Sequence, residues 1–265
     1  RRHHPTFSGF MNYRGRLAPT PTGYLHLGHA RTFWIAQERA RAAGGTLLYR
    51  NENLDSDRCK PEYTEAAMED CRWIGLNWEG DVLHQSDRLG LYREAFEQLK
   101  QSGYLFPCTC TRRDLENAVA APHGEGGETI YPGTCREQTT PPEADCNWRF
   151  RVPDGEHVTF EDAHYGPQQF VAGRDFGDFH VWQKNGMPSY QLAVVVDDAA
   201  QEITEVVRGA DLLVSTARQL LLYRALELIA PSFYHCDLML DTEGNRLAKR
   251  NKALSLRELR TNGKT

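Results

Sequence analysis

Residues 19–29 of this 265-residue chain read Pro-Thr-Pro-Thr-Gly-Tyr-Leu-His-Leu-Gly-His, and the rest of the sequence is arranged around them. The preceding residues, 13–18, have the composition of a short strand. Residues 30–43 carry apolar side chains at helical spacing and end at two glycines. His26 and His29 are therefore expected in a strand-to-helix turn and on the first turn of the helix. A helix N-terminus presents unpaired backbone N–H groups and a positive dipole, so this turn is suited to bind phosphate.

The residues within the turn support a phosphate site. Gly23 and Gly28 let a ligand approach the backbone closely because they carry no side chain. His26 and His29 can donate hydrogen bonds to a phosphate whose charge changes during a reaction. Taken alone, the His-x-Gly-His motif is also compatible with an ordinary turn that carries two solvated histidines, so the flanking residues decide between these interpretations.

Residues 16–32 make the motif specific. They read Arg-Leu-Ala-Pro-Thr-Pro-Thr-Gly-Tyr-Leu-His-Leu-Gly-His-Ala-Arg-Thr, which resembles the HIGH region of class I aminoacyl-tRNA synthetases and specifically of their glutamyl branch. Near the far end of the chain, Arg-Leu-Ala-Lys-Arg at 246–250 is similar to the KMSKS loop, a basic loop that can fold over a triphosphate. Lys249 matches the second lysine of that motif, and Arg246 replaces the first while keeping its charge. The resemblance extends from the first motif to about residue 260.

The bulk composition is that of an ordinary globular protein, with 40% hydrophobic and 25% charged residues. The net charge of −5 argues against a protein coated with basic residues for nucleic-acid binding. No apolar run approaches the length needed to cross a membrane, and no signal peptide is recognisable. Seven cysteines, an odd number, favour a reducing compartment over a disulfide framework. We therefore expect a cytoplasmic protein without a membrane partner, and a monomer.

The order of the remaining elements predicts the fold class. Further strands are expected at 46–50, 148–152, 158–160, 179–183, 190–198 and 238–240, and further helices at 61–74, 88–102 and 212–229. Residues 190–198 are almost uniformly apolar, which is typical of a strand buried on both faces of a parallel sheet. Strands that alternate with helices predict an α/β fold with a Rossmann-type, doubly wound parallel sheet, whose ligands bind at the carboxyl ends of the strands.

Three segments are expected along the chain. Residues 11–104 form the first half of the catalytic domain, residues 105–150 form a small zinc-binding insertion, and residues 151–265 form the second half with the basic loop. The change of character near residue 106 marks the insertion, which contains a loop rich in glycine and proline. Because the chain stops at Thr265, a short helix beyond the basic loop, no anticodon-binding domain is expected.

Three charged residues are candidates for binding an anionic amino acid. Glu52 follows the strand at 46–50, where a carboxylate can hold an ammonium group, although a solvated loop acid would look the same. Arg16 and Arg208 can each bind a carboxylate through two parallel hydrogen bonds, and Tyr190 can add a hydroxyl. The alternatives are an ion pair of Arg208 with one of the aspartates at 197, 198 and 211, and simple core packing of Tyr190.

The resemblance to the glutamyl branch assigns roles to these positions. It implies that glutamate is bound by Arg16, Leu17, Ala18, Pro19, Thr20, Glu52, Tyr190 and Arg208. It implies that ATP, together with Mg²⁺, is bound by His26, Gly28, His29, Arg246 and Lys249, with catalytic roles for His26, His29 and Lys249. Residues 50–55 read Arg-Asn-Glu-Asn-Leu-Asp where the branch usually reads Arg-Ile-Glu-Asp-x-Asp. Since Asn53 lacks the charge of the usual aspartate, no role is carried over to it.

Two pairs of candidate metal ligands bracket the glycine-rich loop. Cys108 and Cys110 form a Cys-x-Cys pair, and Tyr131 and Cys135 form a Tyr-x3-Cys pair that also resembles short relatives in the family. Thiolates suit zinc, which prefers four tetrahedral ligands. We expect one structural zinc ion that fastens an insertion too small for its own core. Tyrosine is an unusual zinc ligand, and the alternatives for the fourth position are Cys146 and His123.

Three interpretations of the function remain open. In the first, the chain resembles short relatives without an anticodon-binding domain, which activate L-glutamate with ATP and esterify it to queuosine in the anticodon of tRNA(Asp). In the second, it is a catalytic fragment of an ordinary glutamyl-tRNA synthetase that charges tRNA(Glu). In the third, it is a non-catalytic paralogue that binds nucleotide or RNA, and the presence of His26, His29 and Lys249 argues against this. The end of the chain at Thr265 and the Cys/Tyr pairs favour the first.

Overall fold

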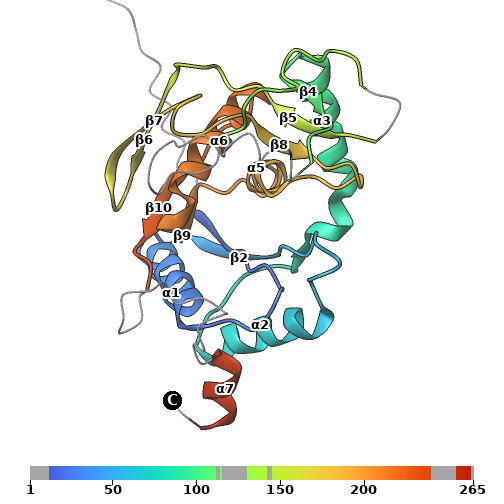
Figure 1. Cartoon of the computed structure of the whole chain (residues 1–265). Helices are drawn as coiled ribbons and strands as arrows, with labels where there is room; N and C mark the ends of the chain where they lie inside the picture. Colours follow the sequence, from blue (N-terminus) through green and yellow to red (C-terminus); the bar gives the residue numbers. More distant parts are fainter. Residues whose placement is uncertain (1–11, 112–113, 115–129, 142–144, 240–254, 264–265) are drawn as a thin grey trace, which may run out of the picture.

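The computed structural model describes residues 12–111, 114, 130–141, 145–239 and 255–263. These residues fold around two sheets whose strands are mainly parallel (Figure 1). The first sheet has the order β1 (Arg14–Leu17), β2 (Thr46–Asn51) and β3 (Leu83–His84). The second has the order β7 (Gly166–Val171), β6 (His157–Asp162), β10 (Ser232–Cys236) and β9 (Glu205–Gly209). All pairs in these two sheets are parallel except the β6–β7 hairpin at one edge.

The two sheets meet where β1 lies beside the start of β9. The backbone N–H of Thr204 donates to the carbonyl oxygen of Arg14 at 2.9 Å, and the N–H of Arg14 donates to the hydroxyl of Thr204 at 2.9 Å. Residues that follow β1 and β2 and residues that end β9 line a common pocket. The junction therefore brings the carboxyl ends of three strands to one place.

A third, antiparallel sheet lies apart from these strands, in the upper part of Figure 1 beside α3 (Leu89–Gln101). It has the order β4 (Leu105–Cys108), β5 (Asn147–Phe150) and β8 (Phe179–Trp182). The segment predicted as an insertion, 105–150, thus shares a sheet with β8, which lies beyond the predicted end of that segment.

The remaining helices of the described residues are α1 (Leu27–Ala42), α2 (Pro61–Trp73), α5 (Tyr190–Ala200), α6 (Leu213–Ala225) and α7 (Leu256–Thr261). Short 3₁₀ turns at Gln85–Arg88 and Ala210–Leu212 precede α3 and α6. Pro61 begins α2, where its missing N–H removes no helical hydrogen bond. Gly44 follows α1 with a φ of 61°, a conformation that glycine adopts without strain. No helix among the described residues is long and apolar enough to span a bilayer.

The expected strands at 13–18 and 46–50 and the expected helices at 30–43, 61–74 and 88–102 are confirmed. The predicted strand at 190–198 is wrong, because these residues belong to helix α5. The Ser189 side chain caps this helix by accepting the backbone N–H of Leu192. The helix packs against α3, α6 and β8 (Figure 1).

The physical reason for this error is uniform burial. Every residue from Leu192 to Asp198 is buried, so no polar stripe interrupts the apolar run. A run that is apolar on all sides gives the same signal for a buried strand and for a buried helix. Length and the capping Ser189 are the features that favour the helix.

Two further boundaries differ from the prediction. The last parallel strand, β10, spans Ser232–Cys236, whereas it was expected at 238–240; residues 238 and 239 belong to no strand, and residue 240 lies outside the described residues. Helix α6 ends at Ala225, whereas the apolar spacing predicted a helix to residue 229. The apolar pattern continues past Ala225 because Leu226 is still buried in the core, although the helix has ended.

Candidate active site

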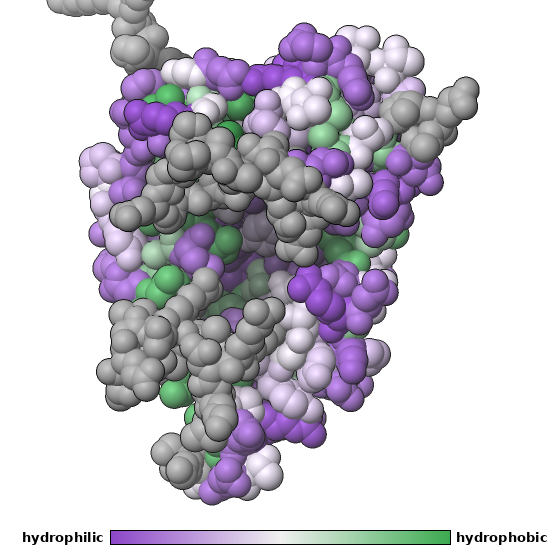
Figure 2. Space-filling view, viewed as in Figure 1, coloured by the Kyte–Doolittle hydropathy of each residue, from purple (hydrophilic) through white to green (hydrophobic). Residues whose placement is uncertain are grey.

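A pocket of about 330 Å³ opens at the carboxyl ends of β1, β2 and β9 and at the N-terminus of α1. Figure 2 shows the molecule hollowed near the middle of the face that is seen in Figure 1. Side chains from well-separated parts of the chain line the pocket, among them Arg16, Glu52, Tyr190 and Arg208. This location agrees with the rule that α/β sheets bind ligands outside the carboxyl ends of their strands.

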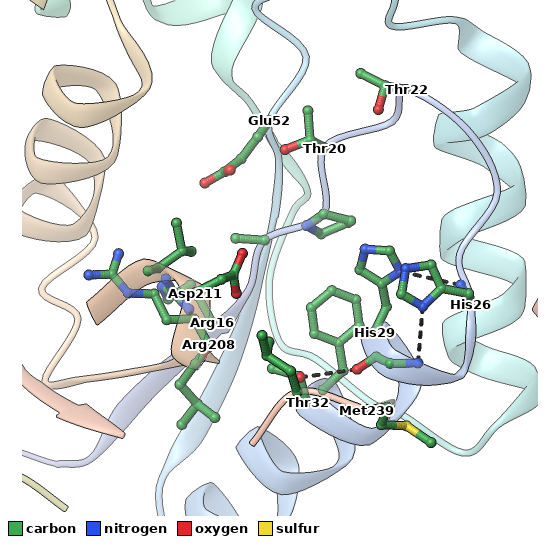
Figure 3. A pocket seen from close by; sticks show the side chains of 18 of the residues that line it. Arg16, Thr20, Thr22, His26, His29, Thr32, Glu52, Arg208, Asp211 and Met239 are labelled. Carbon is green, nitrogen blue, oxygen red and sulfur yellow. Dashed lines mark hydrogen bonds between the residues drawn. The ribbon is translucent and has the colours of Figure 1, made fainter. Parts of the chain in front are cut away.

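His26 and His29 cap the N-terminus of α1 (Figure 3). Nδ1 of His26 accepts the backbone N–H of Gly28 at 3.1 Å, and Nδ1 of His29 accepts the backbone N–H of His26 at 3.2 Å. A neutral imidazole whose Nδ1 accepts a hydrogen bond carries its proton on Nε2. Capping therefore sets the tautomer in which Nε2 of each ring is a hydrogen-bond donor, which is the role that a phosphate ligand requires.

Gly28 is packed against the first of these rings. A Cβ atom at this position would lie 2.9 Å from Cε1 of His26 and 3.0 Å from its Nδ1. A larger residue would therefore have to displace the imidazole. This contact adds a second reason for glycine, beyond the close approach of a ligand that the sequence suggested.

Glu52 is held at the pocket by a fully buried arginine. Arg50 donates from Nε and Nη2 to Oε1 of Glu52, at 3.3 and 3.2 Å, and from Nη1 to Asp198 at 2.7 Å. Arg16 donates to the same Asp198 at 3.3 Å and to the carbonyl oxygen of Val207 at 3.1 Å. Burial raises the pKa of Glu52, and the two arginines oppose that effect. The positive charges of the two arginines are thus balanced by the negative charges of Glu52 and Asp198 beside the pocket.

Arg208 is buried at the pocket but has neutral hydrogen-bond partners. Its Nε donates to Nε2 of His235 at 3.2 Å, and its Nη2 donates to the hydroxyl of Thr216 at 2.7 Å. Its Nη1 is buried without a hydrogen-bond partner in the described part of the chain. Leaving a buried donor unsatisfied costs about 1–3 kcal/mol, and more for a charged group. A ligand carboxylate that reached Nη1 would remove this cost.

The aspartates considered as partners of Arg208 differ in their surroundings. Asp197 accepts from Nε of Arg88 at 2.7 Å, and Asp198 is shared by the arginines at 16 and 50. Asp211, the third candidate, lines the same pocket as Arg208. Two of the three alternatives thus pair with other cations.

Most of the predicted site residues come together in this pocket. Its lining contains Arg16, Ala18, Pro19, Thr20, His26, Gly28, His29, Glu52, Tyr190 and Arg208. Leu17 does not line it, because its side chain is completely buried in the core beside α1. Arg246 and Lys249 lie outside the described residues. Figure 3 shows the two arginines and Glu52 on one side of the pocket and the two histidines on the other.

Sequence reasoning missed the residues that line the pocket after β10. Asp237, Leu238 and Met239 all contribute to its wall. The strand before them was expected too far along the chain, so the loop that reaches the pocket was not recognised. Charged Asp237 directly after the aromatic-rich segment at 233–236 is the signal that could have located it.

The candidate metal ligands gather at a separate cluster, which we call the thiol cluster: Cys108, Cys110, Cys135 and Tyr131. The three sulfur atoms all lie within 4.8 Å of one another. The hydroxyl of Tyr131 is 3.5 Å from the sulfur of Cys108 and 3.5 Å from that of Cys110, and it accepts the backbone N–H of Cys135 at 2.8 Å. Cys146 is not one of these three thiols, and His123 lies outside the described residues.

The thiols of this cluster differ in their surroundings, and burial raises the pKa of the Cys110 thiol to about 11. Arg149 donates from Nε to the sulfur of Cys108 at 3.3 Å, and its guanidinium lies over the ring of Tyr131. Although burial raises the pKa of the Cys135 thiol, hydrogen bonds from Tyr131 and Thr109 lower it to about 7. Soft sulfur donors with one oxygen donor can complete a four-coordinate metal site.

Residues 12–264 match the family model of the tRNA synthetases class I (E and Q), catalytic domain. The α/β fold, the parallel strands and the pocket at their carboxyl ends agree with this match. The chain therefore belongs to the class I tRNA synthetases of this type, and the family predicted from the two sequence motifs is confirmed.

Relatives with a more specific name match nearly the whole chain. The glutamyl-Q tRNA(Asp) synthetase of Nitratidesulfovibrio vulgaris is 45% identical over 94% of this chain and 82% of its own length. The protein of the same name from Symbiobacterium thermophilum is 47% identical over 94% of this chain and 81% of its own length.

A solved structure has the same fold. The glutamate tRNA ligase from Elizabethkingia meningosepticum, in complex with its amino acid, matches with a TM-score of 0.79 and 29% identity over 91% of this chain. The match covers 52% of the ligase, so this chain spans about half the length of that protein.

Proposed function

We propose that this protein is an enzyme that activates glutamate with ATP and transfers it to queuosine in the anticodon of tRNA(Asp). The activation step is supported by one observation: a cationic side chain and an anionic side chain line the same pocket. Arg208 has a buried Nη1 without a partner in the described ranges, and Glu52 presents a carboxylate that accepts two hydrogen bonds from the buried Arg50. The helix N-terminus with its two histidines lies opposite.

Glutamate carries one ammonium and two carboxylates, and the pocket offers a complement for each. The ammonium group binds Glu52, whose contacts with Arg50 use only Oε1. Arg208 and Arg16 are the candidate partners of the carboxylates, and Tyr190 and residues 18–20 complete the walls. Glutamine would leave a desolvated arginine without its partner, at a cost of about 2–5 kcal/mol. The pocket therefore favours glutamate.

The chemical step is an in-line substitution at the α-phosphorus of ATP. A carboxylate oxygen of glutamate forms a bond with this phosphorus while the bond to the leaving pyrophosphate oxygen breaks. His26 and His29 donate from Nε2 to the phosphates as negative charge shifts, and Gly28 keeps the first ring in place. Mg²⁺ bound with ATP would neutralise charge on the phosphates. Arg246 and Lys249 are assigned to the same phosphates from the sequence motif alone.

The acceptor half of the proposal has a different basis. Queuosine carries a cyclopentenediol, and one of its hydroxyls would attack the carbonyl carbon of the glutamyl-adenylate and release AMP. Relatives that match nearly the whole chain carry the name glutamyl-Q tRNA(Asp) synthetase, which supports this acceptor. Bases of single-stranded loops can be splayed into a protein pocket, whereas bases within an RNA helix are less accessible.

We propose zinc as the metal of the thiol cluster, with Tyr131 as the fourth ligand. Three thiols and a hydroxyl already lie within reach of one centre, and four protein ligands leave no position open for catalysis. Bound zinc would crosslink β4 to the segment around Cys135 and so stabilise the fold of this region. The division into segments at 104/105 and 150/151 is part of the same proposal.

Activation is tested by ATP–pyrophosphate exchange with the purified protein and without tRNA. We expect exchange with glutamate and at least tenfold slower exchange, about 1.4 kcal/mol or more, with glutamine. Equal rates with the two amino acids would contradict the assignment of the arginines. Absence of exchange with glutamate in a folded, zinc-loaded protein would contradict the activation step itself.

A further inference from the structure

Behind the pocket, the carboxylate of Asp162 contacts the imidazole of His235, which in turn contacts Arg208. Asp162 ends β6, and His235 lies on the neighbouring strand β10. Nδ1 of His235 lies 2.6 Å from Oδ2 of Asp162, and both side chains are buried. Asp162 also accepts the backbone N–H groups of His164 at 3.0 Å and Tyr165 at 2.9 Å. The carboxylate is therefore fixed in position by the turn that follows its own strand.

The geometry determines which nitrogen of His235 carries the proton. An ionised carboxylate can only accept, so the proton lies on Nδ1. Burial and the neighbouring Arg208 lower the pKa of His235 to about 4, although Asp162 opposes this, so the ring is neutral at pH 7. Nε2 is consequently an acceptor, as the Nε–H group of Arg208 requires at 3.2 Å.

The orientation of Arg208 depends on this acceptor. Nε is held by His235, and Nη2 is held by Thr216, whose hydroxyl in turn donates to the carbonyl oxygen of Leu212 at 3.2 Å. These two bonds fix the plane of the guanidinium, and Nη1 has no hydrogen-bond partner among the described residues. With the proton on Nε2, His235 could donate to the hydroxyl of Thr216, which lies 3.1 Å away, but the Nε–H group of Arg208 would lose its acceptor.

We propose that Asp162 and His235 are positioning residues that aim Arg208 at a carboxylate of the substrate and thereby set the preference for glutamate over glutamine. Neither residue lines the pocket, so both act through Arg208. The inference rests on the proposed function, because it takes glutamate as the ligand of Arg208. The alternative is a polar contact between two strands that stabilises the fold without influencing substrate choice.

The test compares two substitutions of His235 by amide residues, each of which mimics one ring nitrogen of the imidazole and lacks the other. In His235→Gln the amide oxygen reaches the position of Nε2 and can still accept from Arg208. In His235→Asn the shorter amide stays near the position of Nδ1 and can bond only to Asp162. Asp162→Asn gives a third variant, since its amide group can donate to Nδ1 and move the imidazole proton to Nε2. His180→Gln is the control, because His180 is a partly buried histidine on β8 that does not line the pocket.

The primary measurement is the Kd of glutamate by calorimetry, alongside the KM of ATP in the exchange reaction and the melting temperature of each variant. We expect His235→Asn and Asp162→Asn to weaken glutamate binding by about 10- to 100-fold, the usual effect of misplacing a binding group by an ångström. His235→Gln should weaken it less, and the KM of ATP should stay unchanged in all variants. The ratio of glutamate to glutamine affinity should fall in the same order. His180→Gln should lower only the melting temperature.

The outcomes separate the inference from the proposed function. Unchanged glutamate affinity in folded His235→Asn and Asp162→Asn would overturn the positioning role. Equal losses of glutamate and ATP affinity, or an equal loss in His180→Gln, would also overturn it in favour of a structural role. If the unmodified protein binds glutamate but supports no exchange, the proposed function fails. The glutamate affinities of the variants then still test the positioning role. If the unmodified protein does not bind glutamate, both fail.

Discussion

The substrate pocket and the thiol cluster differ in how their charges are balanced and in where their residues come from. In the pocket, Glu52 and Asp198 already neutralise Arg16 and Arg50. These groups come from β1, β2 and α5, and the two sheets hold them in place. The thiol cluster joins the end of β4 to a short segment around Cys135, and Arg149 donates to one of its sulfur atoms.

This difference predicts which site depends on a ligand for its shape. The pocket is supported by buried ion pairs and by the parallel sheets, so its geometry is set before substrate binds. The thiol cluster has a small apolar core consisting of its own side chains and Phe106, and a bound metal would supply its main crosslink. Substitutions should therefore separate the two sites: those in the pocket alter activity, and those in the cluster alter metal content and local stability.

The largest effect on activity is expected for His29. His29→Ala removes both the Nε2 donor and one of the two capping hydrogen bonds of α1, whereas His29→Asn keeps an oxygen that can accept the backbone N–H of His26. Since the donor is the group proposed to act on ATP, both variants should lose about 10²–10³-fold in exchange rate, the usual loss for one preorganised donor. Both should keep their full metal content, measured by elemental analysis. Near-normal activity of His29→Asn would mean that capping alone is the role of this residue.

A smaller effect on activity is expected for Cys110. Cys110→Ser should abolish stoichiometric zinc and make the region around β4 more susceptible to proteolysis, because the remaining donors no longer complete a tetrahedral site. The exchange rate should fall much less than in the His29 variants, since the cluster contributes no residue to the pocket. An activity loss as large as that of His29→Ala would show that the two sites are coupled.

The smallest effect on activity is expected from the residues that compete for the fourth metal position. Tyr131→Phe removes the hydroxyl that approaches two of the sulfur atoms, so it should release zinc more readily in a competition with a chelator. Cys146→Ser should retain zinc with unchanged affinity. The reverse order of zinc affinities would assign the fourth position to Cys146.

The sequence predicted the pocket better than it predicted the fold around it. Polar side chains that follow an apolar strand or begin a helix stand out in the sequence. Glu52, Arg208 and the two histidines could therefore be placed at the carboxyl ends of the strands. Helix α5 could not be recognised from its apolar pattern, because a run buried on every side carries no periodicity. The Asp162–His235 pair was also missed, because its members are separated by 73 positions and meet only through the pairing of β6 with β10.

The identity of the acceptor of the activated glutamate tests the proposed function most directly. Labelled glutamate and ATP are incubated with the protein and with three RNAs: tRNA(Asp) containing queuosine, tRNA(Asp) with guanosine in its place, and tRNA(Glu) with an intact 3′ end. We predict that the label attaches to the queuosine-containing tRNA(Asp) alone and survives removal of the 3′-terminal nucleosides. Charging of tRNA(Glu), or equal labelling of the two forms of tRNA(Asp), would contradict the proposed acceptor and would indicate an ordinary glutamyl-tRNA synthetase activity.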